Sequence, residues 1–161
     1  MCTEIYYQIG SNKTDVLRGA AENDAFNSLI VDAGLTPQAV VLFRAWFRYL
    51  RQAGLTYGLT TVVDALRRAP DLARALVQRF GEAHDPSASR DCSETDAAIA
   101  AGLDAVTAID DDRILRAFHA LIGATLRTNA YTPAANEALA FKLDSAKIPG
   151  LPKPLPWREV W

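Results

Sequence analysis

Two clusters of charged side chains have the types and spacing that could serve chemistry. Arg44, Arg48 and Arg51 follow one another at i, i+4 and i+7, so a helix would place them on one face. Such a row could grip a phosphate or a carboxylate of a partner, although pairing within the chain or exposure to solvent is more common. Asp110–Asp112 could bind a cation, but acids at a helix start usually stabilise the helix dipole. A structural role is favoured for both clusters.

The histidines and cysteines match no known catalytic or metal-binding pattern. His84 and His119 do not combine with Cys2 and Cys92 at any standard zinc spacing. A polar segment surrounds His84, and His119 falls at the edge of an apolar stripe, which favours solvated or hydrogen-bonded roles. The cysteines are interpreted as free thiols, with a disulfide as the alternative. Because glycine-rich phosphate loops, dinucleotide fingerprints and nucleophile elbows are also missing, the sequence predicts no catalytic, cofactor-binding or metal-binding residue.

The composition indicates one domain with a substantial core. The chain has 161 residues, 50% of them apolar, a formal charge of −2 and a pI of about 5.7. A chain of this length buries roughly 70% of the surface that its unfolded form exposes. The weakly acidic balance argues against a nucleic-acid partner. No apolar run reaches about 18 residues, and the N-terminus lacks a signal-peptide pattern, so we expect no membrane segment and a cytoplasmic location.

Apolar spacing predicts a mainly α fold, a helical bundle of about five to six helices with a C-terminal strand and a proline-rich extended tail. Thr36 and Pro37 predict a helix start, Gly34 and Gly54 predict helix ends, and Ser93–Asp96 resembles a capping box. The helices are expected at residues 16–33, 37–53, 59–68, 71–80, 95–108 and 110–131, with a polar loop at 81–92.

The helix at 37–53 is apolar around most of its girth, which predicts that it is central. The helix that begins near Asp110 carries one apolar face with helical spacing. We therefore expect one shared core, made by Trp46, Phe47, Leu50, Phe118, Leu121 and Ile122.

The C-terminal region alternates and then becomes proline-rich. Residues 137–144 have period two, which predicts a half-buried strand, and only one strand is evident. The prolines that follow favour an extended path. Trp157, Val160 and Trp161 are apolar groups without a partner, so we expect a cut inside a larger protein. Residues 145–161 are then expected to be poorly ordered or held by a second copy, with dimerisation through Leu139–Leu143.

Several blocks of the sequence, in order, are similar to one family. The blocks are residues 22–27 with 33–35, 43–52, 111–115 with 126–129, and 141–145 with 148–152 and 156–159. They resemble the very large bacterial NAD-specific glutamate dehydrogenases, over about residues 15–161. The resemblance implies a helical segment just before the catalytic domain, together with the first strand of that domain.

The resemblance also implies what the chain lacks. The family oxidatively deaminates L-glutamate to 2-oxoglutarate and ammonia with NAD, but its glycine-rich substrate segment, catalytic lysine and Rossmann domain lie beyond Trp161. The implied organisation is an unmatched tail (1–15), a helical domain (16–131) and a strand with a proline-rich segment (132–161) that leads into the catalytic domain, its expected partner. The expected role is structural, and a homo-oligomer is expected as a further partner. A free-standing helical interaction or regulatory module without activity is the alternative.

Overall fold

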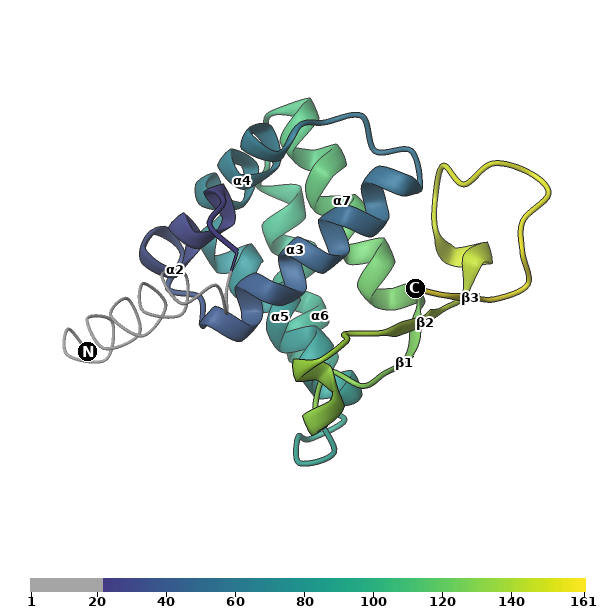
Figure 1. Cartoon of the computed structure of the whole chain (residues 1–161). Helices are drawn as coiled ribbons and strands as arrows, with labels where there is room; N and C mark the ends of the chain where they lie inside the picture. Colours follow the sequence, from purple (N-terminus) through teal and green to yellow (C-terminus); the bar gives the residue numbers. More distant parts are fainter. Residues whose placement is uncertain (1–21) are drawn as a thin grey trace.

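Helices α3 (Pro37–Gln52) and α7 (Ile109–Ala124) cross near the centre of the molecule, and the other helices surround them (Figure 1). The computed structural model describes residues 22–161. The unmatched tail, Cys2 and residues 16–21 of the predicted helix at 16–33 lie outside that range. The remaining helical elements are η1 (Ala25–Ser28), α2 (Leu29–Asp32), α4 (Leu59–Arg68), α5 (Pro70–His84), α6 (Ser93–Asp104), η2 (Pro133–Asn136) and η3 (Ser145–Lys147).

Local signals explain where the central helix begins and ends. The Thr36 hydroxyl accepts a hydrogen bond from the Ala39 amide at 3.1 Å, and Pro37 occupies the first turn, where its missing N–H costs nothing. Beyond the end of α3, Gly54 adopts a φ of 107°, which strongly favours glycine. Gly34, with a φ of 64°, likewise follows α2. These predicted boundaries are confirmed.

Aromatic rings fill the centre of the core. The rings of Phe43 and Phe118 join α3 to α7 with centroids 5.3 Å apart in edge-to-face geometry. Trp46 contacts Phe43 at 5.2 Å and Phe80 of α5 at 5.1 Å. All six residues predicted to form the shared core are buried. The mainly α fold class is confirmed, with six α-helices among the described residues.

Several predicted helix boundaries were wrong, including that of the helix expected at 95–108, which runs from Ser93 to Asp104. Asp24 is extended and accepts a hydrogen bond from the Phe26 amide, so a new helical turn begins there instead of a helix continuing from 16 to 33. Helix α5 continues to His84, which shortens the predicted loop to residues 85–92. The capping box is not formed, because α6 already begins at Ser93 and the Ser93 hydroxyl donates to Asp91.

A small antiparallel sheet takes the place of the single predicted strand. It consists of β1 (Thr125–Thr128), β2 (Phe141–Leu143) and β3 (Glu159–Val160), with β2 in the middle. The predicted helix to residue 131 is wrong because α7 ends at Ala124 and the chain then pairs with β2. An irregularity in that pairing leaves Leu126, expected on the apolar helix face, 40% exposed.

The C-terminus returns to the chain's own helices. The amide and carbonyl of Trp161 exchange hydrogen bonds with those of Phe141, at 3.0 and 2.8 Å. The prediction that residues 145–161 are poorly ordered or held by a second copy is therefore wrong, although Trp157 and Val160 are exposed as expected. Because β2 lies between β1 and β3, it has no free edge for the dimer expected there. Oligomeric state itself stays a prediction.

Candidate functional site

The arginine stripe of α3 is used within the chain. Arg44 is buried and donates from Nε and Nη2 to the two carboxylate oxygens of Asp24, at 2.6 and 2.8 Å. Arg48 pairs with Glu22 near the surface, and Arg51 donates to the carbonyls that follow α3. The favoured structural reading is confirmed, since these arginines fasten neighbouring segments to α3.

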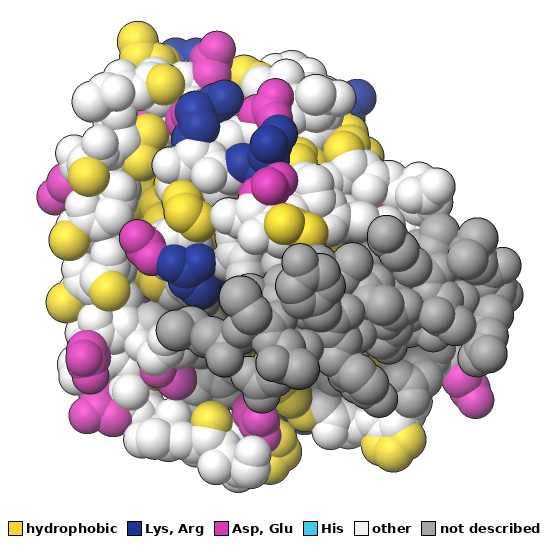
Figure 2. Space-filling model, turned by 90° about the vertical axis from the view of Figure 1, so that its left-hand side faces the viewer, with side chains coloured by type: hydrophobic (Ala, Val, Ile, Leu, Met, Phe, Trp, Pro, Cys, Tyr) yellow, Lys and Arg dark blue, Asp and Glu magenta, His cyan; other side chains and the backbone are white. Residues whose placement is uncertain are grey.

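Further ion pairs join the helices on the outside. Arg67 of α4 pairs with Asp32 of α2 at 2.8 Å and with Asp64 on its own helix at 3.3 Å. Figure 2 shows basic and acidic side chains lying next to one another on the face turned to the viewer. Because charges of both signs alternate there, the part of this face that residues 22–161 form has no single-sign patch that would attract a charged ligand.

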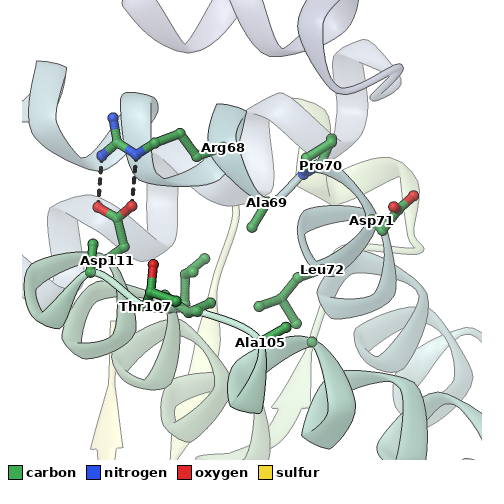
Figure 3. Close-up of a pocket in the computed structure, with 12 residues that line it drawn as sticks. Arg68, Ala69, Pro70, Asp71, Leu72, Ala105, Thr107 and Asp111 are labelled. Atoms are coloured by element: carbon green, nitrogen blue, oxygen red, sulfur yellow. Dashed lines mark hydrogen bonds and ion pairs between the residues drawn. The ribbon is translucent and has the colours of Figure 1, made fainter.

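The acidic run at the start of α7 is also engaged. Asp111 is buried, and its two oxygens accept hydrogen bonds from Nε and Nη2 of Arg68 at 2.7 Å each (Figure 3). These bonds hold the pKa of Asp111 below its usual range. Asp110 accepts a bond from the Tyr57 hydroxyl, and Asp112 pairs with Arg116. Ion pairing thus accompanies the expected helix-dipole role, and no group of three or more possible metal ligands occurs among the described residues.

A cavity of about 350 Å³ lies beside this ion pair. The end of α4, the start of α5 and the loop from α6 to α7 line it, and Leu72 points into it while Asp71 points away (Figure 3). Its polar lining is dominated by the Arg68–Asp111 pair, whose charges already satisfy each other. The cavity therefore presents no free charged group for a substrate.

The histidines are placed as half-buried packing residues. His84 is the last residue of α5, whereas it was predicted to lie in a polar loop. Its ring lies 4.8 Å from that of Phe80. Burial lowers the pKa of His84 and that of His119. The Nε2 atom of His84 is buried and lacks a hydrogen-bond partner within residues 22–161. Among residues 22–161 the thiol of Cys92 is free, and Cys2, the partner in the alternative disulfide, lies outside these residues.

The most specific polar contacts hold the sheet against α3. The Tyr49 hydroxyl donates to Glu159 of β3 at 2.5 Å, and Trp161 Nε1 donates to the Gln52 side chain at 3.0 Å. Burial, followed by the bond to Glu159, raises the pKa of Tyr49. The Trp161 ring also stacks on Phe141 at 6.1 Å. This junction between the helices and the sheet is the best-defined candidate site.

Sequence reasoning missed the junction entirely. Tyr49 and Glu159 are 110 residues apart, and no local pattern indicates that they meet. The one available signal was the cluster of aromatic residues at the C-terminus, which was interpreted as awaiting another domain. A tryptophan two residues after a glutamate can instead lie on the same strand face and contact the same helix.

The described residues do not fit a dinucleotide. Phosphate binding of that kind needs a glycine-rich turn from a strand into a helix. Neither turn that leads from a strand into η2 or η3 contains glycine. The helix starts beside the cavity carry Asp71 and Asp110–Asp112, whose carboxylates would repel phosphate.

Within residues 22–161, the helices lack the length and apolar character that crossing a bilayer requires.

Two family models match consecutive parts of the chain. Residues 21–86 match helical motif 3 of glutamate dehydrogenase. Residues 98–161 match the catalytic domain of bacterial NAD-glutamate dehydrogenase. The catalytic-domain match thus begins inside α6 and includes α7 and the sheet.

Curated relatives match across the junction of the two models. An NAD-specific glutamate dehydrogenase of Mycobacterium tuberculosis is 41% identical over an alignment of 158 residues, which covers 92% of this chain and 10% of the relative. Proteins of the same name from Pseudomonas aeruginosa and Halomonas elongata are 40% and 38% identical, over 91% and 89% of this chain. The chain spans about a tenth of the length of these relatives. It belongs to the bacterial NAD-specific glutamate dehydrogenase family, as a homologue of the segment that runs from helical motif 3 into the catalytic domain.

Proposed function

We propose that this chain is the segment of an NAD-dependent glutamate dehydrogenase that fastens the first strands of the catalytic domain to a helical support. The complete enzyme would deaminate L-glutamate oxidatively to 2-oxoglutarate and ammonia, in the cytoplasm and as an oligomer. The residues that bind NAD and glutamate would come from other parts of the polypeptide. The contribution of this segment is mechanical, because it sets the position of the sheet.

One observation carries this proposal: the two family matches share a single core. Phe43 of α3, in the part similar to helical motif 3, packs on Phe118 of α7, in the part similar to the catalytic domain. Tyr49 then binds Glu159 of β3, again across the two parts. A segment built in this way supports the catalytic domain by holding its first strands on α3.

The test is a chimera in which the aligned segment of the M. tuberculosis relative is replaced by this chain. We expect the resulting chimera to form NADH from NAD and L-glutamate, whereas the purified chain alone forms none. As a control, the chimera carrying Phe118→Ala should lose activity on mild heating before the parent chimera does. If the relative stays fully active after deletion of this segment, the proposal is overturned in favour of a free-standing module.

A further inference from the structure

One row of side chains crosses the sheet on the face turned away from the helices. The strand register places Arg127 of β1 opposite Lys142 of β2, and Lys142 opposite Val160 of β3. All three are exposed, whereas Phe141 and Leu143, which flank Lys142, are buried against the helices. The outer face of the sheet therefore carries two neighbouring cations and a solvent-exposed valine.

The two cations lie in an unfavourable arrangement. Like charges directly opposite each other on a sheet destabilise it. Most other arginines of the described chain pair with an acidic side chain, as Arg158 does with Asp144 at 3.0 Å, although Arg51 and Arg90 do not. Within residues 22–161, neither Arg127 nor Lys142 has an acidic partner within ion-pair distance. An acidic group placed over this row would remove the repulsion.

The edge of the sheet next to this row is also open. Phe141 and Trp161 exchange both of their backbone hydrogen bonds. In an antiparallel pair the next residue along the strand points its N–H and C=O the other way, so those of Val160 face away from β2. Such an edge is a template for another strand. Val160 is 78% exposed and Trp157 is 83% exposed, so apolar surface lies beside the free polar groups.

We propose that the outer edge of β3 and the Arg127–Lys142–Val160 row bind an extended, acidic strand supplied by the rest of the catalytic domain. The proposal rests on the proposed function, because the occupant belongs to the complete enzyme. The added strand pairs with the Val160 backbone, covers Trp157, and places a carboxylate within reach of the Lys142 side chain across β3, which reduces the repulsion between Lys142 and Arg127. A second copy of this chain fits poorly, because its own β3 presents Val160 in this row and so supplies no carboxylate to the cations.

The experiment compares hydrogen exchange of the Val160 amide in the isolated chain and in the chimera with the M. tuberculosis relative. We expect fast, unprotected exchange in the isolated chain and protection in the chimera. The variant R127E/K142E should lower that protection at least about tenfold, because like charges across an interface repel strongly. The matched control R90E, in the exposed loop 85–92, should leave it unchanged.

Each outcome separates this inference from the proposed function. An active chimera whose Val160 amide stays unprotected overturns the inference alone, whereas a folded but inactive chimera counts against the proposed function. If the chimera does not fold, hydrogen exchange is measured in the intact relative, in the segment that aligns with residues 157–161. Unprotected exchange in that segment overturns the inference. Protection of the isolated chain that rises with its concentration indicates a second copy, and protection by inorganic phosphate alone indicates an anion site; either overturns the proposal.

Discussion

In the helical part, α3 and α7 meet through rings that are wholly buried, whereas the sheet meets α3 through a tyrosine, a glutamine and a tryptophan at the molecular edge. Phe43 and Phe118 are 0% exposed, while Trp161 keeps part of its surface in solvent. Apolar burial stabilises in proportion to area and has little directionality. Hydrogen bonds such as that from Tyr49 to Glu159 contribute less but fix one geometry.

The difference between these contacts predicts which part of the molecule unfolds first. The core opens only when the whole domain unfolds, because its contacts are shared among several helices. Strand β3 has only two residues and lies at an edge of the sheet, so we expect it to detach from α3 more easily than β2, whose Phe141 and Leu143 are buried in the core. Placement of the strands is therefore specific and also adjustable, as a junction with further structure requires.

The largest expected effect comes from breaking the centre of the core. Phe118→Ala should lower the free energy of unfolding by about 3–5 kcal/mol, because it leaves a cavity between α3, α5 and α7. Urea denaturation measures the change. The control Val31→Ala removes an exposed side chain and should have almost no effect. An unchanged midpoint for Phe118→Ala would show that the core is not centred on this ring.

A second test compares two arginines of the same stripe. Arg44→Met should cost about 3 kcal/mol, because it leaves the Asp24 carboxylate without its buried partner. Arg48→Met should cost at most about 1 kcal/mol, because its pair with Glu22 is exposed to solvent. Unfolding of both variants in urea measures the difference. Equal losses would mean that burial does not separate the two ion pairs.

The junction itself is tested by Tyr49→Phe, which removes one hydroxyl and little volume. We expect a loss of about 1 kcal/mol in global stability, together with faster hydrogen exchange of the Trp161 amide, because β3 is released from α3. Tyr57→Phe is the matched control, since its hydroxyl binds Asp110 far from the sheet in sequence. If both variants leave the Trp161 amide equally protected, the tyrosine does not hold the strand.

The smallest effect concerns pH and the boundary between the two parts, where His84 lies against Phe80. Burial lowers the pKa of His84 in the folded chain below the value of about 6.5 expected in the unfolded chain. The unfolded chain therefore binds more protons, and stability should fall as the pH drops below about 6.5 towards the folded pKa. His84→Gln should weaken this pH dependence between pH 7.5 and 5 in urea titrations. Curves that run parallel for both proteins would contradict the assignment.

Much of the helical fold was predictable because its signals are local. Thr36 and Pro37 start α3, Gly34 and Gly54 adopt the positive φ values that follow helices, and each signal acts within a few residues. The predictions failed where a local pattern had a competing use. The sequence around Ser93 predicts a capping box, but the Ser93 hydroxyl instead donates a hydrogen bond to Asp91, two residues earlier.

The candidate site was not predictable in the same way. In sequence, Thr125–Thr128 continues an apolar helix. It becomes β1 because β2 offers backbone partners from further along the chain: Thr125 pairs with Leu143 in register, and the Asp144 amide donates to the Ala124 carbonyl. The spacing of the arginine stripe likewise predicted a shared helix face but not which arginine is buried. Only the structure shows that Arg44 is buried beside Asp24, whereas Arg48 is exposed.

By itself, the sequence determined the helices, the apolar faces that form the core, and the family to which the chain belongs, since caps, periodicity and similar blocks are all written in consecutive residues. Only the tertiary structure decided that three strands form, that Trp161 returns to α3, and that Arg127 faces Lys142 across the sheet. The physical reason is that strand pairing and buried polar contacts satisfy groups far apart in the chain, and their partners are chosen by the packed core instead of by their neighbours in sequence.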